Sequence, residues 1–177
     1  AATVHLYAHS FEAAHDCAER ARDFAESTHD PATLAGSLLV LGSIASLTGD
    51  LKNAATAYEK AWAAAPQGGA YFEGGVLLAE FGLLDHWRGD HRRALERLDE
   101  AVRISGEHQV PFWLLFSLFV KGMAHCGCGE YEQALHYLKE GFGLSARLGD
   151  KIWRCRILNG LGWVYMDLSC WELAMRH

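Results

Sequence analysis

The sequence has 177 residues, of which 50% are hydrophobic, 21% are charged and only three are prolines, and these proportions are typical of a helical globular protein rather than of a disordered or fibrous one. The net charge of −6 argues against a protein whose affinity comes from neutralising nucleic-acid phosphates. No apolar run reaches the roughly 20 residues that a membrane-spanning helix needs, and the five cysteines show no disulfide framework, which predicts a cytoplasmic protein without a membrane contact.

The chain begins, by its internal register, in the middle of a structural unit. Residues 1–9 correspond to the end of a first helix, and residues 11–27 are predicted to form a second helix, because small apolar residues recur on one helical face. Asp30 is predicted to cap the following helix, with Pro31 at its first position. We therefore expect this sequence to be a fragment of a larger protein.

A glycine recurs every 40 residues from this point, and it marks a repeated pair of helices. Each glycine is followed seven residues later by a pair that ends the helix, and five residues further on by an alanine. The glycines are Gly42, Gly82, Gly122 and Gly162, and the alanines are Ala54, Ala94, Ala134 and Ala174. We expect both sets to lie where two helices approach closely, since a mid-helix glycine otherwise costs about 1 kcal/mol.

The resulting helix pairs are roughly 32–48 with 51–65, 70–88 with 91–106, 111–128 with 131–148, and 151–168 with 171–177. The turns contain Gly49-Asp50, Gly89-Asp90 and Gly129-Glu130, where glycine can adopt the left-handed conformation that ends a helix. The fourth turn has no glycine, and Ser169 with Glu172 is predicted to form a capping box. Residues 1–177 are expected to be one domain, with repeats at about 1–30, 31–69, 70–109, 110–149 and 150–177.

Several polar clusters resemble chemical sites, and ordinary structural roles are favoured for all of them. His125, Cys126 and Cys128, with His136 further on, look like metal ligands, but residues two apart on one helix point in nearly opposite directions. His5 and His9 share a face without a third ligand. No metal site is therefore predicted.

Catalytic and nucleotide-binding signals are equally weak. Residues 141–146 resemble a dinucleotide fingerprint but fall inside a predicted helix. Glu73, Glu80 and Asp85 are interpreted as solvated or capping acids, and no catalytic residue or cofactor is predicted. The basic cluster is interpreted as a solvated helix face, because acids alternate with its members Arg88, Arg92, Arg93, Arg97 and Arg103.

The spacing of the glycine, the helix-ending pair and the alanine resembles the tetratricopeptide repeat, and four copies agree in register. The common repeat has about 34 residues, whereas this one has 40. Repeats of this length resemble the tetratricopeptide regions of large bacterial signalling ATPases, maltose-type transcription regulators and nucleotide cyclases. HEAT repeats have a similar period but do not require this pattern. The resemblance implies an all-α fold, a right-handed α-solenoid of antiparallel helix pairs.

The resemblance also implies where a ligand would bind. Ligand-facing positions lie three residues before and one residue after each glycine, on the concave face of the first helices. Of the polar residues with which some family members bind a partner's C-terminal carboxylate, only Asn159 is present, so a carboxylate reader is not expected. An apolar partner-binding surface is expected instead, formed by Leu83, Trp87, Leu115, Phe119, Met123, Asn159 and Trp163.

The predicted function is a non-catalytic protein–protein interaction or sensor module of a larger bacterial signalling or regulatory protein. Its partner would be a protein or peptide, such as an amphipathic helix or an adjacent domain. Two alternatives remain open: a self-association module, with a homodimer through the apolar C-terminal end, and a receptor for a small peptide or metabolite. The module is not expected to be an enzyme.

Overall fold

The structure is a computed structural model, and it describes residues 10–65 and 70–176, the side chains of residues 70–74 excepted. Every regular element in these ranges is a helix, and none of the helices is long and apolar enough to cross a bilayer. The helices are α2 (Phe11–Thr28), α3 (Pro31–Leu47), α4 (Leu51–Ala64), α5 (Ala70–Trp87), α6 (His91–Glu107), α7 (Pro111–Gly127), α8 (Tyr131–Leu148), α9 (Lys151–Asp167) and α10 (Trp171–Ala174).

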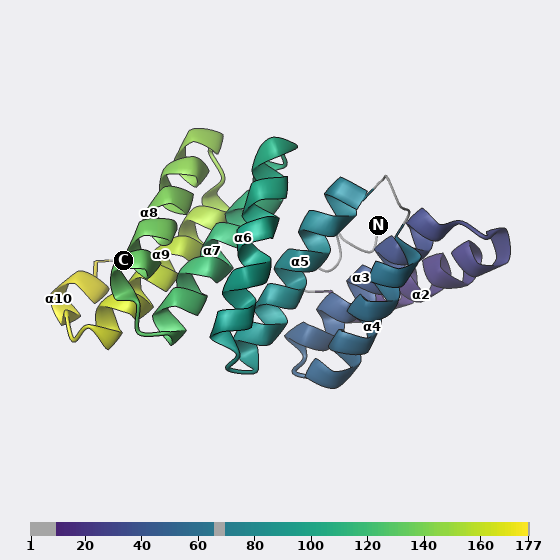
Figure 1. Cartoon of the computed structure of the whole chain (residues 1–177), viewed down its shortest axis with the longest axis horizontal. Coiled ribbons are helices and arrows are strands. Elements are labelled where there is room, and N and C mark those ends of the chain that lie inside the picture. Colours follow the sequence, from purple (N-terminus) through teal and green to yellow (C-terminus); the bar gives the residue numbers. More distant parts are fainter. Residues whose placement is uncertain (1–9, 66–69, 177) are drawn as a thin grey trace.

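The helix boundaries predicted from the repeat are confirmed to within one residue, apart from α10, which ends at Ala174. The first helix predicted within residues 1–9 lies outside the described residues. Consecutive helices pack side by side in alternating directions, and the pairs follow one another along the long axis of the molecule (Figure 1). The all-α solenoid is therefore confirmed.

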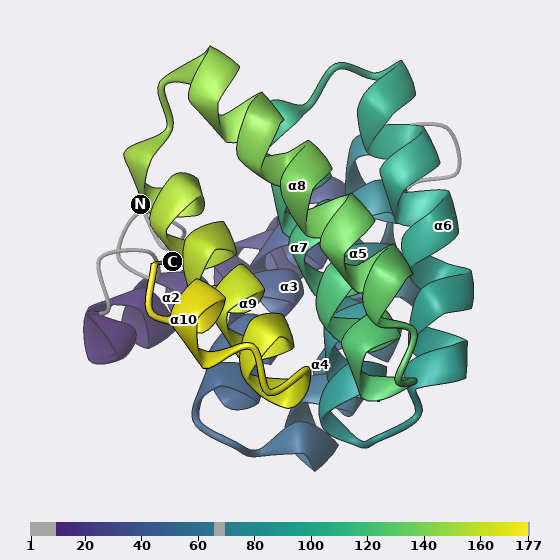
Figure 2. The ribbon, with the colours of Figure 1, turned by 90° about the vertical axis from the view of Figure 1, so that its left-hand side faces the viewer.

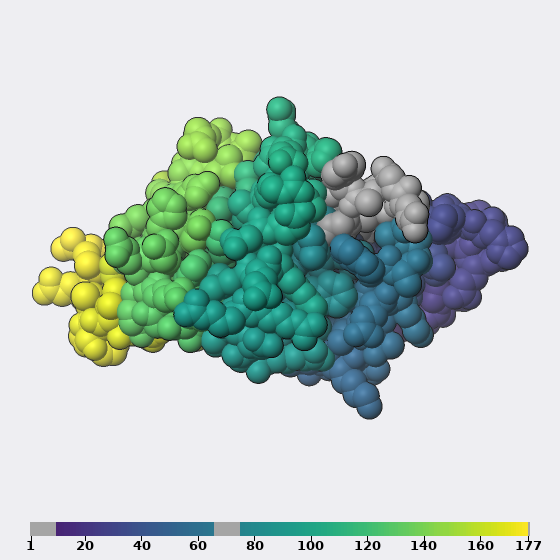
Figure 3. Space-filling model, viewed as in Figure 1, coloured from purple at the N-terminus to yellow at the C-terminus, as the bar shows by residue number. Residues whose placement is uncertain are grey.

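Each first helix packs both on the second helix that precedes it and on the preceding first helix. Thus α7 contacts α6 and α5, and α9 contacts α8 and α7. The view along the stack in Figure 2 shows the helices of successive pairs layered behind one another, and the space-filling view in Figure 3 shows an elongated body. This stacking gives each pair a core that it could not bury alone.

Three of the recurring glycines, Gly42, Gly82 and Gly122, lie at close crossings within the pairs, as predicted. A Cβ atom added to Gly82 would lie 2.6 Å from Leu98 Cγ, and one on Gly122 would lie 2.7 Å from Leu138 Cγ. At Gly42 the added atom would meet the ring of Tyr58. The facing alanines, Ala54, Ala94 and Ala134, have no exposed surface. The alternation of glycine and alanine therefore sets the distance between paired helices.

The turns follow the predicted chemistry in all but one case. The Asp30 carboxylate accepts hydrogen bonds from the backbone N–H groups of Ala32 and Thr33, which confirms the cap. Gly49, Gly89 and Gly129 have positive φ angles of 87°, 82° and 74°.

The predicted capping box of Ser169 and Glu172 is wrong. Ser169 has a φ of 57° and occupies the left-handed position that glycine occupies in the other turns, so Cys170 becomes the N-cap of α10. Its side chain makes no capping hydrogen bond. A residue that ends α9 in the left-handed conformation cannot at the same time supply the extended N-cap of α10.

Candidate functional site

Two positions in each of the first three described helix pairs face the first helix of the next pair, and we call these positions, together with their equivalents in the fourth pair, the inter-repeat positions. The first is the residue after each recurring glycine, occupied by Ser43, Leu83, Met123 and Trp163. The second lies on the second helix, one residue after each recurring alanine, and is occupied by Ala55, Leu95, Leu135 and Met175. Three successive repeats show what these positions contact.

The residues after the glycines pack against the next first helix. Ser43 Oγ lies 3.1 Å from Glu80 Oε1 on α5. Leu83 packs in a cluster with Val120 and Ala124 of α7. The Sδ atom of Met123 lies 3.5 Å from the point where a Cβ atom of Gly160, on α9, would stand. This position is therefore a helix-stacking contact and not a freely exposed groove position.

The second inter-repeat position behaves in the same way. Leu95 is 8% exposed and belongs to the cluster that contains Val120 and Ala124 of α7. Leu135 packs against the cluster that contains Leu161 and Val164 of α9. In both repeats an apolar side chain from the second helix forms part of the surface on which the following first helix packs.

The fourth repeat presents the same two positions with large apolar residues that are exposed. Trp163 on α9 is 55% exposed, and Met175, directly after α10, is 89% exposed. Two further apolar side chains on α10 are exposed, Trp171 by 62% and Leu173 by 39%. Within the described residues, α9 and α10 thus carry exposed apolar side chains at positions that a following helix covers in the earlier repeats.

The residues predicted to bind a partner divide into three groups. Leu115 is 1% exposed inside the cluster of Leu138, Trp153 and Ile157, so its assignment to a binding surface is wrong. The side chain points into the α7–α9 contact, because Leu115 lies one turn before Phe119 on the same packed face of α7.

Phe119, Met123 and Leu83 are half-buried. The ring of Phe119 lies 6.0 Å from that of Trp153, and it meets Gly160 together with Met123, so the structure brings these two residues together at α9. Leu83 lies one repeat earlier. Asn159, Trp163 and Trp87 are exposed, with Trp87 at 42%.

Two acids that were interpreted as solvated or capping are buried instead. Glu80 is 6% exposed and accepts a hydrogen bond of 2.9 Å from the Tyr58 hydroxyl. Burial raises the pKa of Glu80 to about 7. Asp85 is 3% exposed and lies 2.7 Å from Arg97 Nη1. The side chain of Glu73 lies outside the described residues.

The basic residues predicted to form a solvated helix face are not all exposed. Arg103 is exposed and paired with Glu100 and Glu107, as expected of a solvated face. Arg97 instead lies against the helix stack, with its side chain 22% exposed and its guanidinium 4.6 Å from the centre of the Phe81 ring. Arg97 lies against the stack because it pairs with a buried acid.

The histidine and cysteine clusters have structural contacts. His125 stacks on the ring of Tyr137 at 5.3 Å, and its Nδ1 lies 2.7 Å from Glu130 Oε2. Cys126 is buried against α9. Within the described ranges no group of three or more histidine, cysteine, aspartate or glutamate side chains could hold a metal ion, and His5 and His9 lie outside these ranges. The fingerprint-like residues 141–146 lie inside α8.

A stack of antiparallel helix pairs is the architecture of a helical-repeat scaffold. Residues 35–67, which span most of α3 and all of α4, match the family model of the tetratricopeptide repeat. The repeat resemblance read from the glycine and alanine spacing is thus supported by an independent match over one of the repeats. Tetratricopeptide repeats are in general scaffolds for protein–protein interaction. The comparison with curated proteins gives no match.

Three solved structures share the fold at low sequence identity. BtubC (BKLC) from P. vanneervenii is 20% identical with a TM-score of 0.72, over 93% of this chain and 69% of that chain. The apo form of RapI is 12% identical with a TM-score of 0.76, over 98% of this chain and 64% of that chain. A double mutant, MamA RS-1 ArsTM, is 16% identical with a TM-score of 0.60, over 99% and 85%. This chain therefore spans less than two thirds of RapI.

Sequence reasoning missed Met175 as a candidate site residue. The signal was available, because Met175 lies 40 residues after Leu135 and 80 after Leu95. The first helices alone do not show it, because both helices of a pair form the surface on which the following first helix packs.

Proposed function

We propose that this protein is a non-catalytic interaction module of a larger bacterial signalling or regulatory protein in the cytoplasm, and that it binds an amphipathic helix on the end formed by α9 and α10. The observation that carries the proposal is the exposure of Trp163 and Met175 at the two inter-repeat positions. In the preceding repeats, side chains at these positions are covered by a first helix. A helix supplied by an adjacent domain or a partner protein would take the same place.

The contacts in the earlier repeats suggest how such a helix would be held. Trp163 would be the largest anchor, with its indole packed against the partner helix. We expect a small residue of the partner opposite the indole, because Gly160 of α9 lies in the same way opposite Phe119 and Met123. Aromatic anchors of this kind carry much of the binding energy of an interface. Asn159 lies one helical turn before Trp163 and is exposed, so its amide is available to the polar rim of the interface.

A second candidate function is self-association through the same surface. It is favoured by the number of large apolar side chains exposed around the end of the solenoid, which besides the two anchors include Met166, Leu168, Trp171 and Leu173. Exposed apolar patches of this kind promote contacts between copies. Sedimentation velocity across a range of protein concentrations separates the two candidates, because only self-association gives a mass that rises with concentration.

Replacing Trp163 or Met175 by alanine is expected to weaken helix binding. The probe is a fluorescent synthetic peptide of residues 149–168, a first-helix sequence of this chain, and fluorescence anisotropy measures its affinity. Loss of the Trp163 anchor should cost about 2 kcal/mol, which is roughly a thirtyfold rise in Kd, and loss of Met175 should cost less. The melting temperature should change little, because both side chains are exposed.

The matched control is Phe24→Ala, which removes an aromatic ring that is 63% exposed on α2, at the other end of the stack. This variant should bind the probe as the unmodified protein does. Equal losses of affinity for Phe24→Ala and Trp163→Ala would indicate non-specific adhesion of the peptide. Unchanged binding by Trp163→Ala would refute the proposed helix-binding surface.

A further inference from the structure

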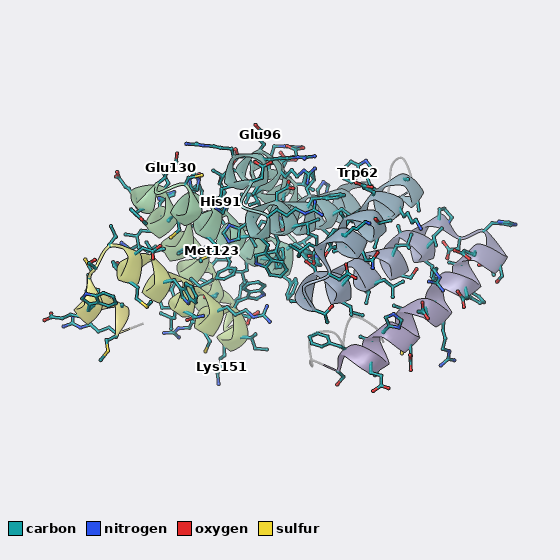
Figure 4. All side chains as sticks on the ribbon, turned by 90° about the horizontal axis from the view of Figure 1, so that it is seen from below. Trp62, His91, Glu96, Met123, Glu130 and Lys151 are labelled. Atoms are coloured by element: carbon teal, nitrogen blue, oxygen red, sulfur yellow. The ribbon has the colours of Figure 1, made fainter. Side chains whose placement is uncertain are left out.

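A cleft lies between the second helices α4 and α6, above the first helix α5 that separates them. It has a volume of about 310 Å³, and the described side chains that line it are Glu59 and Trp62 from α4, Leu78 and Phe81 from α5, and Arg97 from α6. Trp62 is 50% exposed. Figure 4 shows Trp62 along the same edge of the molecule as Glu96, with Met123 away from that edge.

We call the space between α4 and α6 the first interval and the corresponding space between the next two second helices, α6 and α8, the second interval. The second interval has the same architecture but contains a lysine. Lys121 on α7 extends to Asp99 on α6, with 2.5 Å between Nζ and Oδ1. The same ammonium lies 3.9 Å from the centre of the Tyr137 ring on α8. The side chain of Lys121 is only 9% exposed. An acid from one second helix and an aromatic ring therefore hold a buried cation in this interval.

The residues of the first interval correspond to those of the second at a spacing of 40. Glu59 corresponds to Asp99, Phe81 to Lys121, and Arg97 to Tyr137. The first interval therefore has the acid but lacks the lysine, because a phenylalanine stands in its place. The cation of this interval, Arg97, lies 4.6 Å from the centre of the Phe81 ring but pairs with Asp85 at 2.7 Å and, among the described contacts, not with Glu59.

We propose that the cleft between α4 and α6 is a second binding site, which takes a lysine side chain of a partner protein, with its ammonium group at Glu59 and its methylene stem against Trp62 and Phe81. The intramolecular lysine of the next interval is the precedent for this chemistry. Long basic side chains commonly bury their methylene groups on apolar surfaces while the charge meets an acid or an aromatic face.

The electrostatics of the cleft permit a cation despite the presence of Arg97. Arg97 pairs with Asp85 at 2.7 Å, and the same Asp85 oxygen lies 3.7 Å from Arg93 Nε, so this carboxylate offsets part of the arginine charge beside the cleft. No ion pair of Glu59 is found among the described residues, so its carboxylate is available to a ligand. The cleft does not involve α9 or α10, so this site stands or falls independently of the helix-binding surface proposed above.

The test uses two small probes that differ only in the terminal ammonium group. N-acetyl-lysine N-methylamide is the ligand, and N-acetyl-norleucine N-methylamide is the uncharged control. The indole N–H resonance of Trp62, assigned by its loss in Trp62→Phe, is followed by NMR during titration at pH 7. We expect the lysine probe to shift this resonance saturably in the millimolar range and the norleucine probe to give no saturable shift.

Glu59→Gln should raise the apparent Kd of the lysine probe about threefold to fivefold, as is typical of losing one partly exposed ion pair. The matched control is Glu96→Gln on α6, which removes the same charge outside the cleft and should leave the Kd unchanged. The proposal is overturned if the lysine probe gives no saturable shift, if both probes bind equally, or if Glu59→Gln and Glu96→Gln have the same effect.

Discussion

Replacing Gly122 by leucine should lower the free energy of unfolding by about 3 kcal/mol, because the side chain would have to enter the crossing of α7 and α8. A Cβ atom alone would lie 2.7 Å from Leu138 Cγ and 3.2 Å from the backbone oxygen of Ala134. The Leu138 side chain has no exposed surface into which it could move, and a carbonyl oxygen moves only with its helix. The gain in helix propensity, at most about 1 kcal/mol, offsets only part of this cost.

Gly36→Leu is the matched control for this substitution. Gly36 also lies in the interior of a helix, α3, but a Cβ atom there would meet nothing within 4 Å. This variant should be more stable than the unmodified protein by up to about 1 kcal/mol, since only the backbone propensity changes. Urea denaturation followed by circular dichroism measures both variants. Similar changes for Gly122→Leu and Gly36→Leu would show that the crossing is not tightly packed.

The helix pairs could be predicted from the sequence because their determinants are local and repeated. Gly82 and Gly122 mark the crossings, and glycines such as Gly129 end the helices by adopting positive φ angles. Each of these requirements is written in a few neighbouring residues, and repetition at 40-residue intervals removes chance matches. The fourth turn was predicted wrongly because Ser169 adopts a conformation that is uncommon for serine.

The candidate site could be predicted only in part, because its definition depends on contacts between repeats. Met123 and Trp163 are equivalent in sequence, yet Met123 meets Gly160 of the next helix whereas Trp163 is exposed. Leu115 resembled a groove residue for the same reason, since an apolar side chain on a first helix can face either a partner or the adjacent repeat. Asp85 pairs with Arg97 across two helices, and nothing in the spacing of acids alone indicates that pairing.

Glu80 shows most clearly how a non-local contact changes the chemistry of a residue. It is buried between α3, α4 and α5, where its described partners are the hydroxyl groups of Tyr58 and Ser43. Ser43 Oγ also lies 3.0 Å from the carbonyl oxygen of Leu39, so its single proton can satisfy only one of the two acceptors. A protonated Glu80 would donate to Ser43 and leave the serine proton for Leu39. Burial therefore raises the pKa of Glu80 to about 7, and the neutral acid fits its surroundings best.

This pKa predicts a specific pH dependence of stability. The ordinary value for a glutamate is about 4.3 in an unfolded chain, so between about pH 4.5 and 7 the folded state holds a proton that the unfolded state has released. Stability then falls as the pH rises through this window and levels off above it, with a total loss of about 3 kcal/mol. The effect is largest above pH 7, where the folded state must carry a buried, uncompensated carboxylate.

Glu80→Gln should therefore raise the free energy of unfolding at pH 8 by as much as about 3 kcal/mol and leave it nearly unchanged at pH 4.5. Glutamine imitates the neutral acid, because its carbonyl can accept from Tyr58 and its amide can donate to Ser43. The measurement is the difference in urea stability between variant and unmodified protein across this pH range, so that the titration of other groups cancels. Glu96→Gln, an exposed substitution, should give a difference near zero at every pH. A pH-independent difference for Glu80→Gln would mean that Glu80 is ionised in the folded protein throughout, with a cation or water compensating its charge.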